Sequence, residues 1–189
     1  MKTFSLRWML VLVILALPGL SAAQRAPAPG DRLPDMRLDS PENPDTRAYL
    51  GLSPGDTFDP AAITGSLLVI EIFSMYCPVC QREAPAVNRL HQAIEASQTL
   101  RGRVKMIGIG VGNSAYEVDY FRKHYQVTFP LFADPDFLIH KTLGEVRTPF
   151  FIIATIGPND KGRVLWTDAG NMEVQEIFLN RLKGFLSLD

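Results

Sequence analysis

The chain has 189 residues, of which 47% are hydrophobic and 21% are charged, which is enough apolar material for one globular domain. Its formal charge of -1 at pH 7 gives no indication of a nucleic-acid partner. No long run of like charges occurs either, so nothing predicts a polybasic patch that binds a membrane surface.

The N-terminus has the pattern of an export signal. Two cations precede an apolar run from Trp8 to Leu17, and small residues follow it up to Ala23. The run is shorter than the roughly 20 apolar residues that a helix needs to cross a bilayer. We therefore predict a signal peptide over 1–23, cleaved before Gln24, and a mature protein that is periplasmic or secreted. An uncleaved signal that anchors the chain in the membrane is the alternative.

Residues 24–60 are rich in proline, glycine and aspartate, a composition typical of turns and loops. We expect a tethering arm there, with one short strand near Met36–Leu38. Residues 61–189 alternate strand-like and helix-like patterns and contain no internal repeat. We expect them to form one α/β domain.

The first element of that domain is the apolar run LLVIEIF at 67–73, which predicts a strand covered on both faces. Apolar residues then recur at helical spacing and predict a helix over 78–97. Ser114 and Glu117 have the spacing of a capping box, which predicts the start of another helix. The turn-rich segment after residue 155 predicts an antiparallel hairpin, so the central sheet should be mixed, with helices on both faces. We expect further strands over 103–111, within 129–136, and over 150–155 and 163–168, and further helices over 115–125, 137–143 and 172–186.

Both cysteines lie where the strand 67–73 gives way to the helix 78–97. This places Cys77 at the N-cap of the helix and Pro78 at its first position, where a missing N–H costs nothing. The N–H groups of Val79 and Cys80 then point at the Cys77 sulfur, and with the helix dipole they should lower its pKa below the ~8.5 of a free thiol. We therefore expect Cys77 to attack and Cys80 to resolve the mixed disulfide.

Other roles for the cysteine pair fit the sequence less well. A structural disulfide over so short a loop would restrict the unfolded chain little. A zinc site needs four ligands, and the three histidines of the chain lie far apart. Attachment of c-type haem needs a histidine where Gln81 stands. In an oxidising compartment we expect Cys77 and Cys80 to form a redox-active disulfide.

Four stretches of the sequence carry a family resemblance. They are APGDRLPDMRL, YCPVC at the strand-to-helix junction, FADPDFLIHKTLGEV and RTPFFIIA, and the order of elements that they mark covers most of residues 30–170. With them the sequence resembles the thioredoxin superfamily, and within it the exported TlpA- and ResA-like thiol-disulfide oxidoreductases. The resemblance implies a thioredoxin fold, with a mixed central sheet flanked by helices and an N-terminal extension.

The resemblance also implies an activity and its partners. Such a periplasmic oxidoreductase exchanges a Cys77–Cys80 disulfide or dithiol with client proteins, here expected to act as a reductase, and a membrane electron donor recharges it. Cytochrome c maturation is one process that the resemblance suggests. We expect a monomer without cofactor, stably bound metal or nucleic-acid partner.

Five residues near the cysteines are implied to contact clients. Pro149 falls at the position of a cis-proline that faces the cysteines, which would leave Thr148 free to pair with an extended peptide. Tyr76 stands where tryptophan is usual before the first cysteine. Pro78 and Val79 differ from the dipeptides of both reducing and oxidising relatives, so the redox potential and the direction of electron flow stay open.

Two acids are candidates for handling the proton of the exchange. Glu71 lies in the buried strand, at the position of a buried aspartate in thioredoxins, and burial should raise its pKa. Glu83 lies just after Cys80, at the position of an active-site glutamate in the ResA-like group. Its alternative role is to stabilise the first turn of the helix through the helix dipole.

Other functions share parts of these patterns. A peroxiredoxin-like peroxidase would have Ser74 three residues before its cysteine, as here, but a proline where Ile70 stands. A copper or haem-apoprotein chaperone would hold its client through the same cysteines without turnover. The segment GVGNSA at 110–115 fits a dinucleotide-binding pattern only weakly, and a tight turn into a capped helix explains it better.

Overall fold

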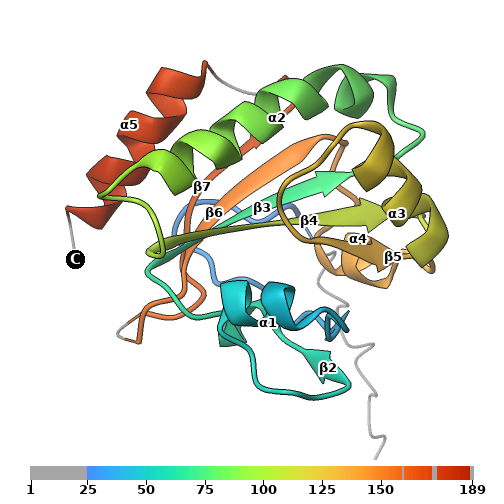
Figure 1. Cartoon of the computed structure of the whole chain (residues 1–189), viewed down its shortest axis with the longest axis horizontal. Coiled ribbons are helices and arrows are strands. Elements are labelled where there is room, and N and C mark those ends of the chain that lie inside the picture. The colour runs from blue at the N-terminus through green and yellow to red at the C-terminus, as the bar shows by residue number, and fades with distance from the viewer. Residues whose placement is uncertain (1–24, 159, 172–173, 188–189) are drawn as a thin grey trace, which may run out of the picture.

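The computed structural model of the chain describes residues 25–158, 160–171 and 174–187. The predicted signal peptide over 1–23 and its cleavage site lie outside the described residues. Within the described part, a central sheet carries helices on both faces (Figure 1). No helix of this part is both long and apolar enough to cross a membrane.

The sheet is built from β3 (Leu67–Phe73), β4 (Val104–Val111), β5 (Leu131–Asp134), β6 (Phe150–Thr155) and β7 (Val164–Ala169). These five strands lie in the order β5-β4-β3-β6-β7. The first three in the chain run parallel, whereas β6 is antiparallel to β3 and β7 is antiparallel to β6. The mixed sheet and the late hairpin that the sequence predicts are therefore confirmed.

The helices are α1 (Pro44–Leu50), α2 (Pro78–Ala96), α3 (Ala115–His124), α4 (Leu138–Thr142) and α5 (Gln175–Leu186). All seven residues of β3 are buried, and alternate side chains point to opposite faces of the sheet. Leu67, Val69 and Phe73 pack with α2, α3 and α5, and the other set packs with α1 and α4. Residues 172–173 of the predicted last helix lie outside the described residues.

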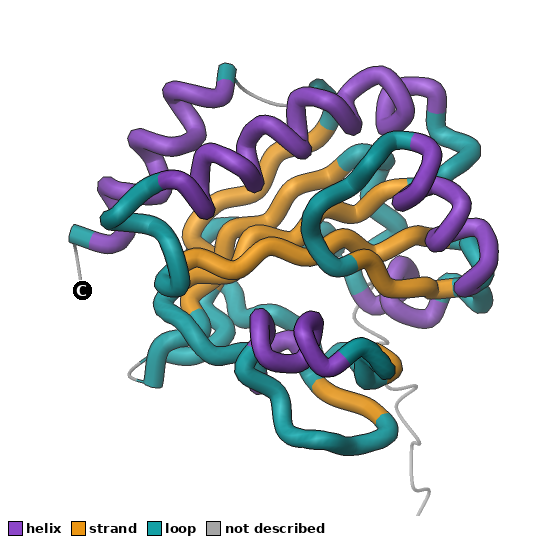
Figure 2. Tube along the Cα trace, in the orientation of Figure 1, coloured by secondary structure: helices purple, strands orange, loops and turns teal. Residues whose placement is uncertain are grey.

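The N-terminal segment, residues 25–62, packs against one face of this sheet, below it in the view of Figure 2. Strands β1 (Leu38–Asp39) and β2 (Thr57–Phe58) pair antiparallel, so a short strand is present but lies at 38–39, slightly later than the expected 36–38. Residues Met36, Leu38, Leu50 and Phe58 are buried in the apolar core of that face. The segment expected to be a tethering arm is thus packed on the domain.

Helix α1 was not predicted from the sequence. The Asn43 side chain accepts hydrogen bonds from the first backbone N–H groups of the helix, and Pro44 is its first residue. Gly51 ends the helix in the left-handed conformation, with φ at +67°. An asparagine, a proline and a final glycine at these positions are recognised helix signals. They were obscured by the high density of turn-forming residues around them.

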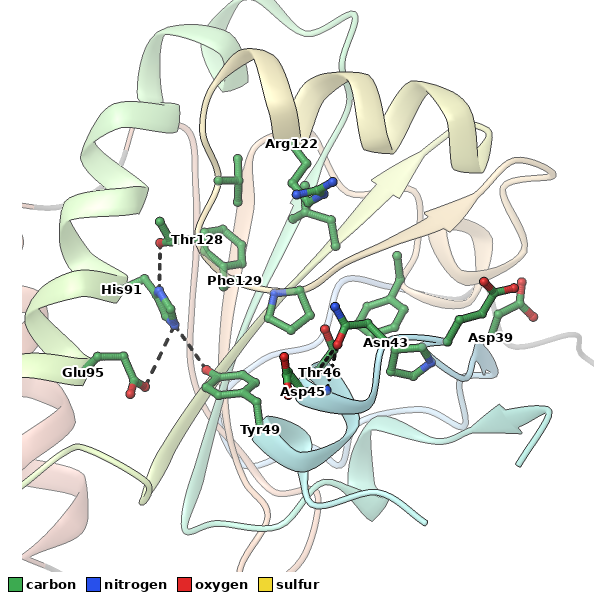
Figure 3. A pocket seen from close by; sticks show the side chains of 16 residues that line it. Asp39, Asn43, Asp45, Thr46, Tyr49, His91, Glu95, Arg122, Thr128 and Phe129 are labelled. Carbon is green, nitrogen blue, oxygen red and sulfur yellow. Dashed lines mark hydrogen bonds and ion pairs between the residues drawn. The ribbon is translucent and has the colours of Figure 1, made fainter. Parts of the chain in front are cut away.

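Tyr49 of α1 covers an open edge of the sheet. β5 pairs with Gly108–Val111 of β4, so in the described part of the chain no strand covers the earlier half of β4 on that side. The Tyr49 hydroxyl accepts a hydrogen bond from the buried Met106 N–H at 2.9 Å. Its oxygen also lies 3.4 Å from Nε2 of His91 on α2, and both side chains line a hollow of about 610 Å³ (Figure 3). Tyr49 thus supplies the partner that a strand would otherwise give to this backbone donor.

Candidate active site

The strand register brings Cys77 and the Thr148–Pro149 bond together. Ile72, near the end of β3, is paired with Phe150 at the start of β6, so the residues just before β6 lie beside the loop that follows β3. The Cys77 thiol donates a hydrogen bond to the Thr148 carbonyl oxygen at 3.4 Å. The Thr148–Pro149 peptide bond is cis, as the family resemblance implies.

Cys77 occupies the N-cap of α2, with Pro78 as the first helical residue, as predicted. Its sulfur accepts a hydrogen bond from the Cys80 backbone N–H at 3.2 Å. Partial burial raises the pKa of the Cys77 thiol. Hydrogen bonds lower the pKa by more than burial raises it, and they come from the side chain and N–H of Cys80, the Thr148 side chain and the Val79 N–H. The net effect is a pKa below that of an ordinary thiol, which favours the thiolate.

Cys80 has the opposite environment. Its side chain is fully buried in the first turn of α2, and both cysteines are free thiols in this structure. Burial raises the pKa of Cys80 strongly, and the hydrogen bond to Cys77 and the negative charges of Cys77 and Glu71 raise it further. Cys77 is therefore the more acidic and more accessible sulfur, and Cys80 keeps its proton.

Glu71 lies in β3 on the face of the sheet that α2 covers. It is two residues from both Val69 and Phe73, and side chains two residues apart in a strand point to the same face. Its side chain is buried, and burial raises its pKa to about 8, with smaller contributions from the charges of Cys77 and Glu83. Glu83 is half-buried on α2. The structure thus brings both predicted acids within electrostatic reach of each other.

The residues implied to contact clients surround Cys77 at different depths. Tyr76 and Pro78 are exposed, Val79 and Thr148 are half-buried, and Pro149 is buried. The surface beside the accessible sulfur therefore includes side chains from the loop after β3, from the first turn of α2 and from the loop before β6.

Sequence reasoning missed the residues that hold the loop before Cys77. Asn113 is fully buried, and its Oδ1 accepts a hydrogen bond from the Met75 N–H at 2.8 Å. Gln81 Nε2 donates to the Met75 carbonyl at 2.7 Å. Asn113 reaches this loop because the end of β4 lies beside the end of β3, where Gly110 is paired with Phe73. The segment GVGNSA thus contains the end of β4, a turn with Gly112 at φ +62°, and Ser114, the first residue of the predicted capping box.

The polar chemistry of this site is that of a dithiol beside a buried acid. Among the described residues, no three His, Cys, Asp or Glu side chains are grouped so as to hold a metal ion. The arrangement provides one stabilised thiolate, one protonated thiol next to it in the helix, and a carboxyl group of raised pKa nearby. These are the groups that thiol-disulfide exchange needs.

Comparison with protein families gives one match that covers most of the chain. The model of the AhpC/TSA family matches residues 29–165. The chain belongs to the AhpC/TSA family. The match spans most of the N-terminal segment, the cysteine pair and the cis-proline together. No curated protein sequence matches the chain.

Solved structures share the fold over most of their length. One is described as thiol:disulfide interchange protein DsbE from Chlorobium tepidum, with a TM-score of 0.62, 15% identity, and coverage of 82% of this chain and 96% of that one. StoA from Bacillus subtilis has a TM-score of 0.54 and 19% identity, covering 79% and 96%. A secreted disulfide oxidoreductase from Mycobacterium tuberculosis has a TM-score of 0.53 and 21% identity, covering 69% and 90%. The predicted thioredoxin-like fold is therefore confirmed.

Proposed function

We propose that the protein is a thiol-disulfide oxidoreductase that exchanges a Cys77–Cys80 dithiol or disulfide with client proteins. The observation that carries this proposal is the inequality of two neighbouring thiols. Cys77 is partly exposed and hydrogen-bonded as an acceptor at a helix N-terminus, and Cys80 is buried beneath it. A structural cysteine pair would not need one sulfur poised as a nucleophile.

In the reductive direction the Cys77 thiolate attacks a client disulfide. A mixed disulfide forms, the client S–S bond breaks, and the first client sulfur leaves and takes up a proton. Cys80 then loses its proton and attacks the Cys77 sulfur, which releases the second client sulfur. Two electrons pass from the dithiol to the client, and the protein is left with a Cys77–Cys80 disulfide.

Glu71 is the group we assign to accept the Cys80 proton. Its charge raises the pKa of Cys80, which places the two groups within electrostatic reach. The negative charge of Cys77 in turn raises the pKa of Glu71. That charge disappears when Cys77 enters the mixed disulfide, so Glu71 becomes a carboxylate more readily at the step that needs a base.

The proposed location rests on the predicted signal peptide, and the proposed process rests on the family resemblance. The predicted signal peptide supports a periplasmic or secreted protein, and an exported dithiol requires a membrane electron donor to reduce it again. We place the protein as a reductase in that setting, with unfolded c-type cytochromes as clients in cytochrome c maturation. The membrane-anchored form of the same protein is the alternative.

A trapping experiment tests the function. Cys80→Ala, expressed in the native host, should accumulate mixed disulfides on Cys77, whereas the control with both Cys77→Ser and Cys80→Ala should accumulate none. Mass spectrometry of the trapped proteins identifies the clients, and trapped apocytochromes would support a role in maturation. Disulfide reduction that survives Cys77→Ser would refute the mechanism.

Parallel assays separate the alternatives. Stoichiometric copper binding or apocytochrome binding without turnover would indicate a chaperone. Rapid consumption of hydrogen peroxide with slow disulfide exchange would indicate a peroxidase.

A further inference from the structure

Glu117, at the start of α3, uses its two carboxylate oxygens on two different elements. Oε2 accepts hydrogen bonds from the Ser114 backbone N–H at 2.7 Å and from its hydroxyl at 2.8 Å. Oε1 accepts a hydrogen bond from the phenol of Tyr76, the residue directly before Cys77. The hydrogen bond between them lowers the pKa of Glu117 and raises the pKa of Tyr76. At neutral pH Glu117 therefore stays ionised as the acceptor and Tyr76 stays protonated as the donor. The helix cap therefore orients the carboxylate, and the carboxylate holds the Tyr76 ring.

The main chain next to Tyr76 is held by other groups. The peptide groups of Met75 are bound by Asn113 and Gln81. The Cys77 N–H donates to the Ser74 carbonyl at 3.0 Å. Because these contacts keep the backbone in place, Glu117 acts on the ring of Tyr76 and not on the position of the Cys77 sulfur.

Tyr76 separates two hollows on the surface beside Cys77. The first, of about 410 Å³, lies towards α3 and is lined by Met75, Tyr76, Ser114, Tyr116, Glu117 and Tyr120. The second, of about 350 Å³, lies towards the loop before β6, and its lining includes Phe137, Arg147 and Thr148. The Tyr76 ring lines both, so its orientation sets the shape of each.

The hollow towards α3 has the side chains of a recognition surface. Tyr76 is 65% exposed, and Tyr116 is 79% exposed. Tyrosines combine a large apolar ring with a polar tip and are enriched in the centres of protein interfaces. A ring that is already oriented also loses little conformational entropy when a partner binds.

We propose that Glu117 is a positioning residue that holds Tyr76 as a wall between these two hollows, and that this wall selects client polypeptides. The occupant is the extended client segment that flanks the attacked disulfide, because Tyr76 adjoins Cys77 and the second hollow is lined by Thr148, which contacts the Cys77 sulfur. This inference rests on the proposed function and adds a determinant of client affinity to it. The chemistry at sulfur is unchanged.

Steady-state reduction of insulin, with dithiothreitol as electron donor, tests the proposal. Tyr76→Phe and Glu117→Ala should each raise the KM for insulin about three- to tenfold, the range expected for one hydrogen bond. The double variant should be no worse than the poorer single variant, because both changes remove the same contact. Glu117→Gln should restore a KM near that of the wild type, since its amide can bond to both the cap and the phenol.

Two controls isolate the effect. Asp119→Ala removes the ion pairs of Asp119 with Arg122 and Lys123 on the same helix and should leave the KM unchanged. With bis(2-hydroxyethyl) disulfide, which is too small to extend across the hollows, the KM should rise less than with insulin. Melting temperatures check that each variant is folded.

The outcomes separate this inference from the function on which it rests. A wild type that reduces neither disulfide would overturn the proposed function and the inference with it. If the wild type is active and the KM of Tyr76→Phe for insulin lies within twofold of the wild-type value, the inference alone is overturned. Additive effects of the two changes, or an equal rise in the Asp119→Ala control, would also overturn it.

Discussion

The replacement Glu71→Gln should stabilise the protein at neutral pH and change its stability little at pH 4.5. Glu71 is buried, and its pKa is raised from 4.5 to about 8, chiefly by burial. Glutamine has the shape of the protonated side chain but cannot ionise. It therefore resembles the state that the folded protein prefers.

The size of the effect follows from the raised pKa. Between pH 4.5 and pH 8 the unfolded chain releases the Glu71 proton and the folded chain keeps it, so the unfolded state binds fewer protons and the free energy of unfolding falls as pH rises. At about 1.4 kcal/mol for each pH unit, the loss reaches about 3 kcal/mol at pH 7. Glu71→Gln lacks this loss, so its advantage over the wild type should grow from near zero at pH 4.5 to about 3 kcal/mol at pH 7.

Urea unfolding between pH 4.5 and pH 8, with the cysteines kept reduced, measures this difference. The exposed Glu42→Gln, which removes a surface carboxylate, is the matched control for the substitution. In a Cys77→Ser background most of the pH dependence should remain, because burial and not the Cys77 charge is the main cause. A difference for Glu71→Gln that is constant with pH would refute the reasoning.

Three further outcomes follow from the structure. At pH 7 iodoacetamide should alkylate Cys77 and leave Cys80 largely unmodified, as measured by peptide mass spectrometry; equal labelling would contradict the assigned acidities. Tyr49→Phe should lower the free energy of unfolding by about 1–2 kcal/mol because it leaves the Met106 N–H without its acceptor, and an unchanged urea midpoint would contradict this role. Burial lowers the pKa of His91, so the folded state resists its protonation and stability should fall as pH drops below about 6.5. His91→Asn should lose less stability than the wild type between pH 7 and pH 5, and an equal loss would exclude this cause.

The parts of the site that are determined by residues adjacent in the sequence were predictable. The apolar run predicts the strand, and Cys77 followed by Pro78 predicts the start of the helix after it. Both signals lie in adjacent residues of the sequence. The burial of Glu71 was predictable for the same reason, since a continuous apolar strand must be covered on both faces. Its raised pKa follows from that burial.

The parts that depend on register were not predictable. Asn113 reaches Met75 only because β4 lies beside β3 with Gly110 opposite Phe73, and no pattern in the sequence gives that pairing. Glu117 was recognised as a capping residue, but its second oxygen could be assigned to Tyr76 only once α3 was placed beside the loop. Polar residues such as Asn113 and Glu117 thus belong to the site because the fold brings segments that are distant in the sequence next to the loop before Cys77.

In the proposed exchange, the hydrogen bond from Cys77 to the Thr148 carbonyl oxygen links the ionisation of the sulfur to the docking of a client. A carbonyl oxygen at the start of an extended segment is the acceptor that a client backbone N–H would use to add itself as a strand. While Cys77 is a thiol, it donates a hydrogen bond to this oxygen, which lies 3.4 Å from the sulfur. When the thiol ionises, the oxygen loses that donor at the moment the sulfur becomes able to attack. In the proposed exchange, ionisation of Cys77 therefore frees one acceptor site of the Thr148 oxygen for a client N–H and forms the nucleophile in the same step.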